Sequence, residues 1–144
     1  MITRVVALLC LISLASCSSI EPAKIVDGAA LSGVRSAYVV QHEESKEGIP
    51  QALQDALVAQ GVRATHGGLA SKPAVVDATV TYVDRWQWDV GMYLASLDVE
   101  IRMDDTNALI ASGRFKNSPF LHSFPRAAGK SVEVIESIFE ANAK

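Results

Sequence analysis

Histidine and carboxylate side chains are the residues of this sequence that could hold a metal ion or transfer a proton. The histidines are His42, His66 and His122, and none stands three or four residues from a second metal ligand within an expected helix. Zinc and copper sites need clustered imidazole, thiolate or carboxylate ligands, so this spacing does not favour them. His42 precedes Glu43 and Glu44, and a solvated loop explains that run better than a metal site. We expect no metal and no cofactor.

A hydrolase would need a nucleophile, a base and a carboxylate within hydrogen-bond reach of one another. The sequence has no Gly-x-Ser-x-Gly turn, and Gly67-Gly68 lacks the lysine and helix of a phosphate-binding loop. The polar face of a sheet, or turns, explain the acidic residues of the expected strands: Asp77, Asp84, Asp89 and Asp98. We expect no catalytic residue and no enzyme. A hydrolase stays an alternative only if His42 or His122 meets a serine and a carboxylate in the fold.

The two cysteines lie close to the N-terminus of the chain. Arg4 precedes the apolar run Val5–Leu14, whose length of about ten residues suits a signal-peptide core and is half of what a membrane span requires. The motif Leu14-Ala15-Ser16-Cys17 then resembles the lipobox of bacterial lipoproteins, in which the cysteine thiol is diacylated and the signal is cut just before it. An ordinary secretory signal with an incidental cysteine is the alternative.

This resemblance has consequences for the location of the protein. It implies that residues 1–16 are a signal peptide that is removed, taking Cys10 with it, and that lipid on Cys17 anchors the mature chain to a membrane. By the sorting rule of Gram-negative bacteria, Ser18 in place of an aspartate after that cysteine implies the outer membrane, with the domain facing the periplasm. No thiol is then left for a disulfide.

Charge and composition exclude several classes of protein. The chain of 144 residues carries 13 basic and 16 acidic side chains, a formal net charge of −3. A nucleic-acid-binding domain of this size would show a basic excess, so we expect no nucleic-acid partner. With 49% hydrophobic and 20% charged residues, the composition is that of one globular domain with a single core.

The elements that must position these residues follow from hydrophobic patterning. Residues 17–33 show no sustained period, which indicates a lipidated N-terminus and a tether, and residues 34–144 form the expected periplasmic domain. Strands are expected over Arg35–Gln41 and Val62–Thr65, on either side of a helix over Gly48–Gln60. Such a strand–helix–strand unit predicts that its two strands are parallel.

Period-two alternation dominates the second half of the chain. Over Ala78–Val90 every second residue is apolar except Asp84, which predicts a long strand with one apolar face and a bulge near Asp84-Arg85. Two more strands and a closing helix are expected over Tyr93–Met103, Leu109–Phe115 and Arg126–Ala143. The order β-α-β-β-β-β-α predicts an α+β two-layer sandwich, with a mixed, largely antiparallel sheet and two helices on one face.

Aromatic residues are the remaining candidates for a functional surface. By the period-two rule, Tyr82, Trp86 and Trp88 share one face of their strand. Packing into the core under a helix is the favoured interpretation, and an exposed platform for a partner or ligand is the alternative. The loop that contains Phe120 and Phe124 is either a lid over the end of the sheet or a second binding surface.

Further motifs resemble a known group of proteins. The strand Asp77–Asp89, followed by Met92-Tyr93-Leu94 and Ser112-Gly113, resembles small proteobacterial lipoproteins of unassigned function, which imply no activity. The element order is also similar in outline to the plug lipoprotein of lipopolysaccharide export and to activators of penicillin-binding proteins, in topology only.

Together these patterns lead us to expect a membrane-anchored lipoprotein that acts as a non-catalytic accessory or scaffold and binds another envelope component, such as a protein. The alternative is a periplasmic carrier of a small ligand or lipid with an aromatic-lined groove. A cavity on the order of 300 Å³ or more beneath the helices would favour the carrier. A closed core with exposed apolar loops would favour partner binding.

Overall fold

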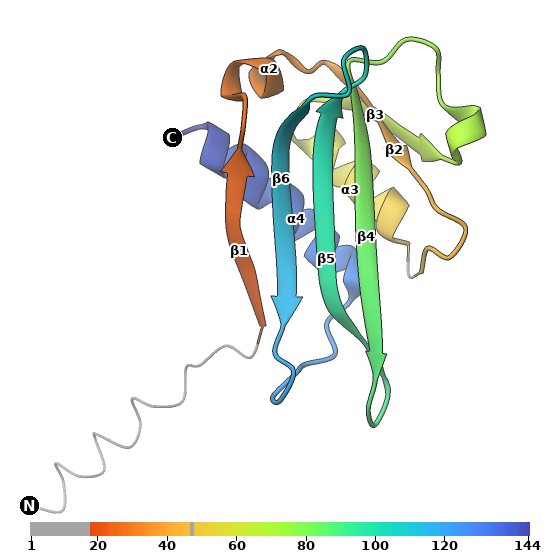
Figure 1. Ribbon diagram of the computed structural model, residues 1–144, viewed down its shortest axis with the longest axis vertical. Helices are drawn as coiled ribbons and strands as arrows, with labels where there is room; N and C mark the ends of the chain where they lie inside the picture. The colour runs from red at the N-terminus through yellow and green to blue at the C-terminus, as the bar shows by residue number, and fades with distance from the viewer. Residues whose placement is uncertain (1–17, 47) are drawn as a thin grey trace, which may run out of the picture.

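The structure, a computed structural model, describes residues 18–46 and 48–144 (Figure 1). The expected signal peptide and Cys17 lie outside these residues. The strands are β1 (Ser18–Ile25), β2 (Ser36–Val40), β3 (Arg63–Gly67), β4 (Ala78–Trp88), β5 (Met92–Met103) and β6 (Leu109–Asn117). The helices are α2 (Gly28–Gly33), α3 (Ile49–Ala59), the short 3₁₀ turn η1 (Leu69–Ser71) and α4 (Ala127–Asn142).

One six-stranded sheet contains all the described strands, in the order β1-β6-β5-β4-β2-β3. The strand β2 runs parallel to β3, as the strand–helix–strand unit predicts, and it is also parallel to β4. The pairs β4–β5, β5–β6 and β1–β6 are antiparallel. The mixed, largely antiparallel sheet is thus confirmed.

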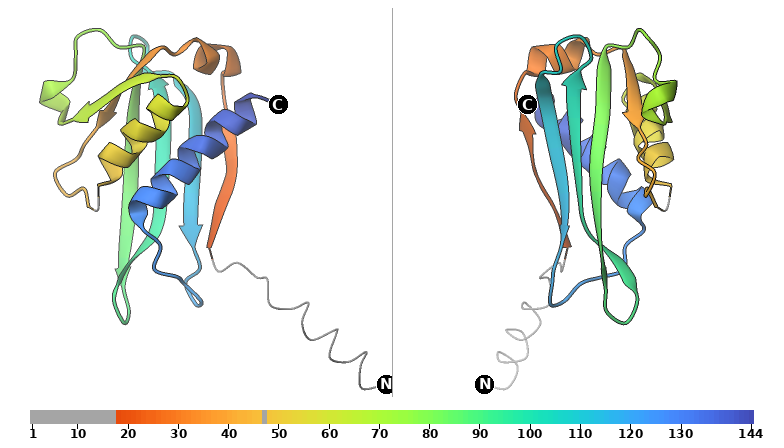
Figure 2. Two further views of the ribbon diagram at one scale, coloured as in Figure 1. Left: turned by 180° about the vertical axis from the view of Figure 1, so that it is seen from behind. Right: turned by 45° about the vertical axis from the view of Figure 1, so that its right-hand side comes forward.

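The helices α3 and α4 cover one face of the sheet and leave the other face open (Figure 2). Alternating apolar residues of the central strands meet apolar faces of the helices in one core, which includes Leu53, Val80, Leu97, Phe115 and Ile135, all at most 1% exposed. This two-layer α+β sandwich confirms the predicted fold class. The helix α2 is an addition, a short helix that follows β1.

The sequence-based expectation of a tether over residues 17–33 is corrected by the structure. Residues 18–25 form the edge strand β1, which pairs with β6 from Ser18 opposite Asn117 to Ile25 opposite Ala111. Pro22 lies where the register shifts between Glu21 and Lys24, a place in an edge strand where a missing N–H is tolerated. This irregularity hides the period of the strand in the sequence, and residues 18–25 belong to the folded domain.

The strand β4 bends where its apolar face is interrupted. Its register with β5 shifts between Arg85 and Trp86, which confirms the bulge expected near Asp84-Arg85. Beyond the shift, the β4–β5 hairpin projects past the helices at one end of the sheet (Figures 1 and 2). Side chains at the hairpin tip therefore lack a helix to pack against.

Candidate functional site

The aromatic residues of β4 do not form one platform. Tyr82 is 5% exposed and belongs to the core, as the favoured interpretation expects. Trp86 is half-buried against that core, whereas Trp88, near the tip of the hairpin, is 72% exposed. Core packing therefore accounts for the first two rings, and only Trp88 offers a broad apolar surface to a partner.

A hydrogen-bonded cluster surrounds Asp84, whose side chain is only 2% exposed. Its carboxylate lies 2.7 Å from His42 Nε2 and accepts a hydrogen bond of 2.7 Å from Trp86 Nε1. Tyr82 lies beside His42, with 4.9 Å between ring centroids, and its hydroxyl donates to Ser45 Oγ at 2.5 Å. Burial raises the pKa of Tyr82. These bonds satisfy a buried carboxylate and fix the loop after β2 against β4.

The cluster meets one part of the condition set for a hydrolase. His42 reaches a carboxylate, but among the hydrogen bonds of the described residues none joins its ring to a serine hydroxyl. Ser45 is bonded to Tyr82 instead. His122 faces Asp89 at 3.4 Å, and its Nδ1 is buried without a hydrogen-bond partner among the described residues. Among the hydrogen bonds of the described residues, neither histidine–carboxylate pair is thus joined to a serine side chain.

The exposed aromatic residues gather at one end of the sheet. We call this surface the apolar end; it consists of Trp88, Val90, Met92, Phe120, Leu121 and Phe124. Six of the eleven exposed large apolar side chains of the described residues lie there, with Val90 at 90% and Phe120 at 91% exposure. Single exposed apolar residues are ordinary, whereas such a concentration marks an interaction surface.

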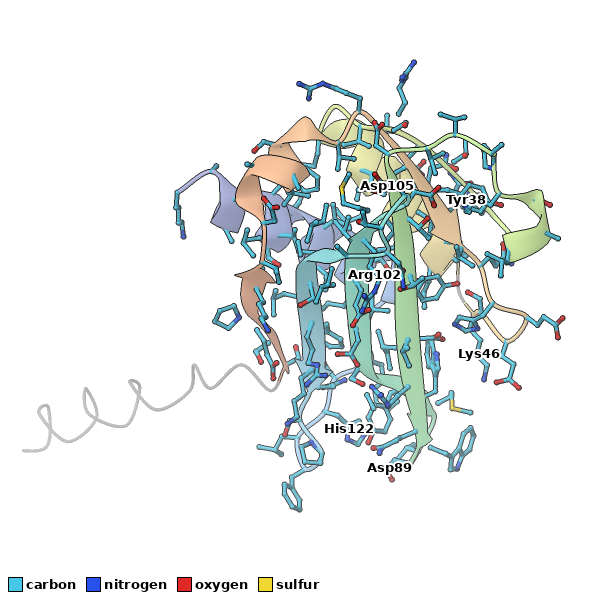
Figure 3. All side chains as sticks on the ribbon, turned by 45° about the horizontal axis from the view of Figure 1, so that its top comes forward. Tyr38, Lys46, Asp89, Arg102, Asp105 and His122 are labelled. Atoms are coloured by element: carbon cyan, nitrogen blue, oxygen red, sulfur yellow. The ribbon has the colours of Figure 1, made fainter. Side chains whose placement is uncertain are left out.

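Two loops form the apolar end, and specific contacts hold them together. His122 of the β6–α4 loop stacks on Tyr93 of β5, with 3.8 Å between centroids, and Phe124 meets both rings edge-on. Figure 3 shows His122 and Asp89 close together at this end of the sheet. Asn117 donates to the carbonyls of Leu94 and Ser123, which ties the loop to β5. These contacts hold the β6–α4 loop in a fixed position relative to β5 and the β4–β5 hairpin.

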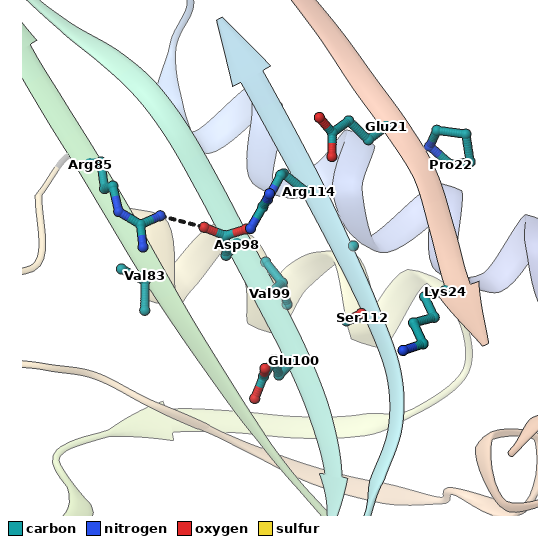
Figure 4. A pocket seen from close by; sticks show the side chains of 11 residues that line it. Glu21, Pro22, Lys24, Val83, Arg85, Asp98, Val99, Glu100, Ser112 and Arg114 are labelled. Carbon is teal, nitrogen blue, oxygen red and sulfur yellow. Dashed lines mark hydrogen bonds and ion pairs between the residues drawn. The ribbon is translucent and has the colours of Figure 1, made fainter. Parts of the chain in front are cut away.

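The open face of the sheet carries charged side chains. Asp98 of β5 accepts hydrogen bonds from Arg85 on one side, at 2.6 Å, and from Arg114 on the other (Figure 4). This bond raises the pKa of Arg114 above its ordinary value. Cross-strand pairs of this kind add little stability at a solvated face. They do give the face a fixed charge pattern that a partner could recognise.

The hollows described for this structure lie on its surface. Two on the open sheet face have volumes of about 410 and 420 Å³ and share Arg85 and Arg114. Another, of about 560 Å³, is lined by residues of the Asp84 cluster, and one of about 870 Å³ lies beside β3. The space between helices and sheet is filled by side chains such as Leu53 and Ile138, both fully buried. This closed core does not favour a carrier groove.

The described residues contain neither a cluster of metal ligands nor a membrane-spanning helix. No group of three or more histidine, cysteine or carboxylate side chains there could hold a metal ion. No helix in the same part of the chain is both long and apolar enough to span a membrane. His66, the third histidine, donates a hydrogen bond of 2.7 Å from Nδ1 to Gln54 Oε1.

Sequence reasoning missed part of the apolar end. It selected Trp88, Phe120 and Phe124, but its favoured interpretation packed Trp88 in the core, because period-two alternation places this ring on the same face as Tyr82 and Trp86. It assigned no binding role to Val90 or Met92. Their signal was the run of apolar residues around Gly91 at a chain turn, a position where a core role is disfavoured.

Comparisons with known proteins extend the fold description. The chain matches no protein-family model, and no curated protein is similar in sequence. Two structures of the PelC dodecamer from Paraburkholderia phytofirmans, one a single-substitution variant, have TM-scores of 0.51 and 9% identity, over 87% of this chain and 95% of that chain. A PDZ domain protein from Parabacteroides distasonis has a TM-score of 0.50 and 10% identity, over 91% of this chain and 38% of that chain. At these identities the likeness shows the fold alone.

Proposed function

We propose that this protein is a lipid-anchored envelope protein of a Gram-negative bacterium that acts as a non-catalytic accessory or scaffold. Cys17 carries the anchor, residues 1–16 are the signal peptide, and the domain faces the periplasm from the outer membrane. The observation that carries the proposal is the apolar end, where exposed aromatic and aliphatic side chains are concentrated on a domain with a closed core. Such a domain acts through contacts at its surface.

The comparisons lend this proposal limited support. PelC, whose fold is similar, is described as a dodecamer, a protein that forms an assembly. A PDZ domain protein shares the fold over part of its length. The open sheet face, with its fixed row of Arg85, Asp98 and Arg114, is the second surface through which an assembly could form.

The first test concerns the anchor. Mass spectrometry of the full-length protein purified from membranes should show a mature chain that begins at Cys17 and carries acyl chains. The Cys17→Ala variant should lack the acyl mass and leave the membrane fraction. An unmodified Cys17 in the wild-type protein would contradict a lipid anchor.

The second test concerns the bound component. A photo-crosslinking amino acid is placed at Phe120 in the apolar end, or at Gln87 on the open sheet face, in cells that express the full chain. Mass spectrometry should identify a discrete envelope protein captured from at least one position, and the Cys17→Ala background should abolish the capture. If neither position captures a specific protein in intact membranes, the accessory function is wrong.

A further inference from the structure

The start of β1 lies at the same end of the sheet as the apolar end. Ser18 pairs with Asn117, the last residue of β6, and the β6–α4 loop with Phe120 and Leu121 follows directly. Figures 1 and 2 show that β1 begins at the same end of the sheet as this loop and the β4–β5 hairpin, which projects further. A cysteine at position 17 is one residue, about 3.8 Å along the chain, from this strand.

This geometry leaves no spacer between an anchor and the folded domain. The strand β1 is held by β6 over its length, and Ile20 and Ile25 pack against the core. Acyl chains on Cys17 would therefore bring the end of the sheet to the surface of the bilayer. The side chains that meet that surface first are those of the apolar end.

We infer that the apolar end docks on the lipid bilayer and inserts Trp88, Phe120 and Leu121 into its interface. This inference rests on the proposed lipid anchor and assigns the bilayer as the component that this surface binds. Tryptophan favours the boundary between headgroups and acyl chains, and buried apolar side chains add to the affinity of a lipid anchor. Trp88 is the last residue of β4 at the hairpin, and Phe120 and Leu121 lie in the β6–α4 loop. These side chains can therefore enter the interface while the rest of the sheet stays outside the bilayer.

The charges around the apolar end fit an anionic lipid surface. Lys116, next to the end of β6, and Arg126, at the start of α4, are exposed and form no ion pair with a described residue. The acidic Asp89 of the hairpin faces His122. The chain as a whole is acidic, at −3, so two free cations at this end favour contact with anionic headgroups.

Tryptophan fluorescence tests the inference directly, because the chain has only Trp86 and Trp88. The acylated full-length protein is reconstituted into vesicles of phosphatidylethanolamine and phosphatidylglycerol, with or without bromine on the acyl chains. In the Trp86→Phe variant, Trp88 should show a blue-shifted emission and severalfold stronger quenching by brominated lipid than Trp86 shows in Trp88→Phe. Equal, weak quenching of both residues would overturn the inference.

A matched pair of variants tests the contribution of the loop. In the Trp86→Phe background, Phe120→Ser with Leu121→Ser should lower the quenching of Trp88 severalfold. Val75→Ser, which removes an equally exposed apolar side chain just before the start of β4 at the opposite end, should leave it unchanged. Equal effects of the two changes would also overturn the inference.

The outcomes separate this inference from the proposed function. Strong quenching of Trp88 without any captured protein supports bilayer docking and contradicts the accessory function. A protein captured from Phe120 without quenching of Trp88 supports the accessory function and overturns bilayer docking. Strong quenching together with a protein captured from Gln87 supports both, with the open sheet face as the protein contact.

Discussion

Asn117 is the residue that fixes the β6–α4 loop. It is 5% exposed; its amide nitrogen donates to two carbonyls, and its Oδ1 accepts the backbone N–H groups of Ser118 and Ser123. Asn117→Ala should free residues 118–125, because a methyl group replaces none of these bonds. Hydrogen exchange of the loop should become faster by an order of magnitude or more. Lys116→Ala, an exposed neighbour, is the control, and unchanged exchange in Asn117→Ala would show that the rings around His122 suffice.

The carboxylate of Asp84 has a comparable role between β4 and the loop after β2. Asp84→Ala leaves Trp86 Nε1 and His42 without their acceptor, at a position where the carboxylate is only 2% exposed. We expect a loss of about 1–3 kcal/mol in the free energy of unfolding, measured by urea denaturation. Asp105→Ala, which removes an exposed carboxylate in the turn after β5, should change stability by less than about 0.5 kcal/mol. A loss no larger than that of this control would contradict the structural role of the cluster.

At the scale of elements, the packing of α4 on β6 depends on a glycine. A Cβ at Gly113 would lie 2.8 Å from Val134 and 3.0 Å from Ile138, closer than packed carbon atoms allow. Gly113→Ala should therefore push α4 from the sheet and cost about 1–3 kcal/mol of stability. Gly129→Ala places a methyl group in open space on α4 and should instead add about 0.5–1 kcal/mol. Thermal melting of both variants checks the contrast; a neutral Gly113→Ala would show that the helix can shift freely.

The strands and helices differ in how well the sequence predicts them. The long strands β4 and β5 and the helices α3 and α4 have sustained periods, which in β4 only Asp84 breaks, and their predicted bounds agree with the structure to within two residues. The strand β1 was taken for a tether because Pro22 and the register shift beside it break its alternation. The favoured interpretation of core packing fails at Trp88, which is 72% exposed, because the β4–β5 hairpin projects past the helices. Local pattern identifies a strand but not the length over which a second layer covers it.

For the candidate site, the sequence identified several of the residues but not the contacts between them. Phe120 and Phe124 were selected in a loop that is either a lid or a binding surface, and the structure shows both exposed and adds the exposed hairpin residues Val90 and Met92. The contact between these loops joins segments about thirty residues apart, through the stacking of His122 on Tyr93. Such a contact has no periodic signature in the sequence. The same holds for the bond between His42 and Asp84.

At the scale of the whole molecule, two carboxylates link its elements at the end opposite the apolar end. Asp77 accepts the backbone N–H groups of Arg35 and Ser36 at the start of β2, at 2.9 and 2.8 Å. These bonds lower its pKa below the ordinary 3.8. Asp104, after β5, accepts Lys72 Nζ and Thr79 Oγ1, both at 2.6 Å, and its pKa is lowered for that reason.

The lowered pKa values predict how stability depends on pH. Because the folded protein binds these protons more weakly than the unfolded chain, the carboxylates stabilise the fold above about pH 4 and lose this effect as the pH falls through their folded pKa values. The melting temperature should therefore drop between about pH 4 and pH 2. Asp77→Asn should melt below the wild type at pH 6, and the difference should shrink towards pH 2.5. The exposed Asp105→Asn is the control, and a difference for Asp77→Asn that stays constant with pH would show that its charge does not stabilise the junction of β2 and β4.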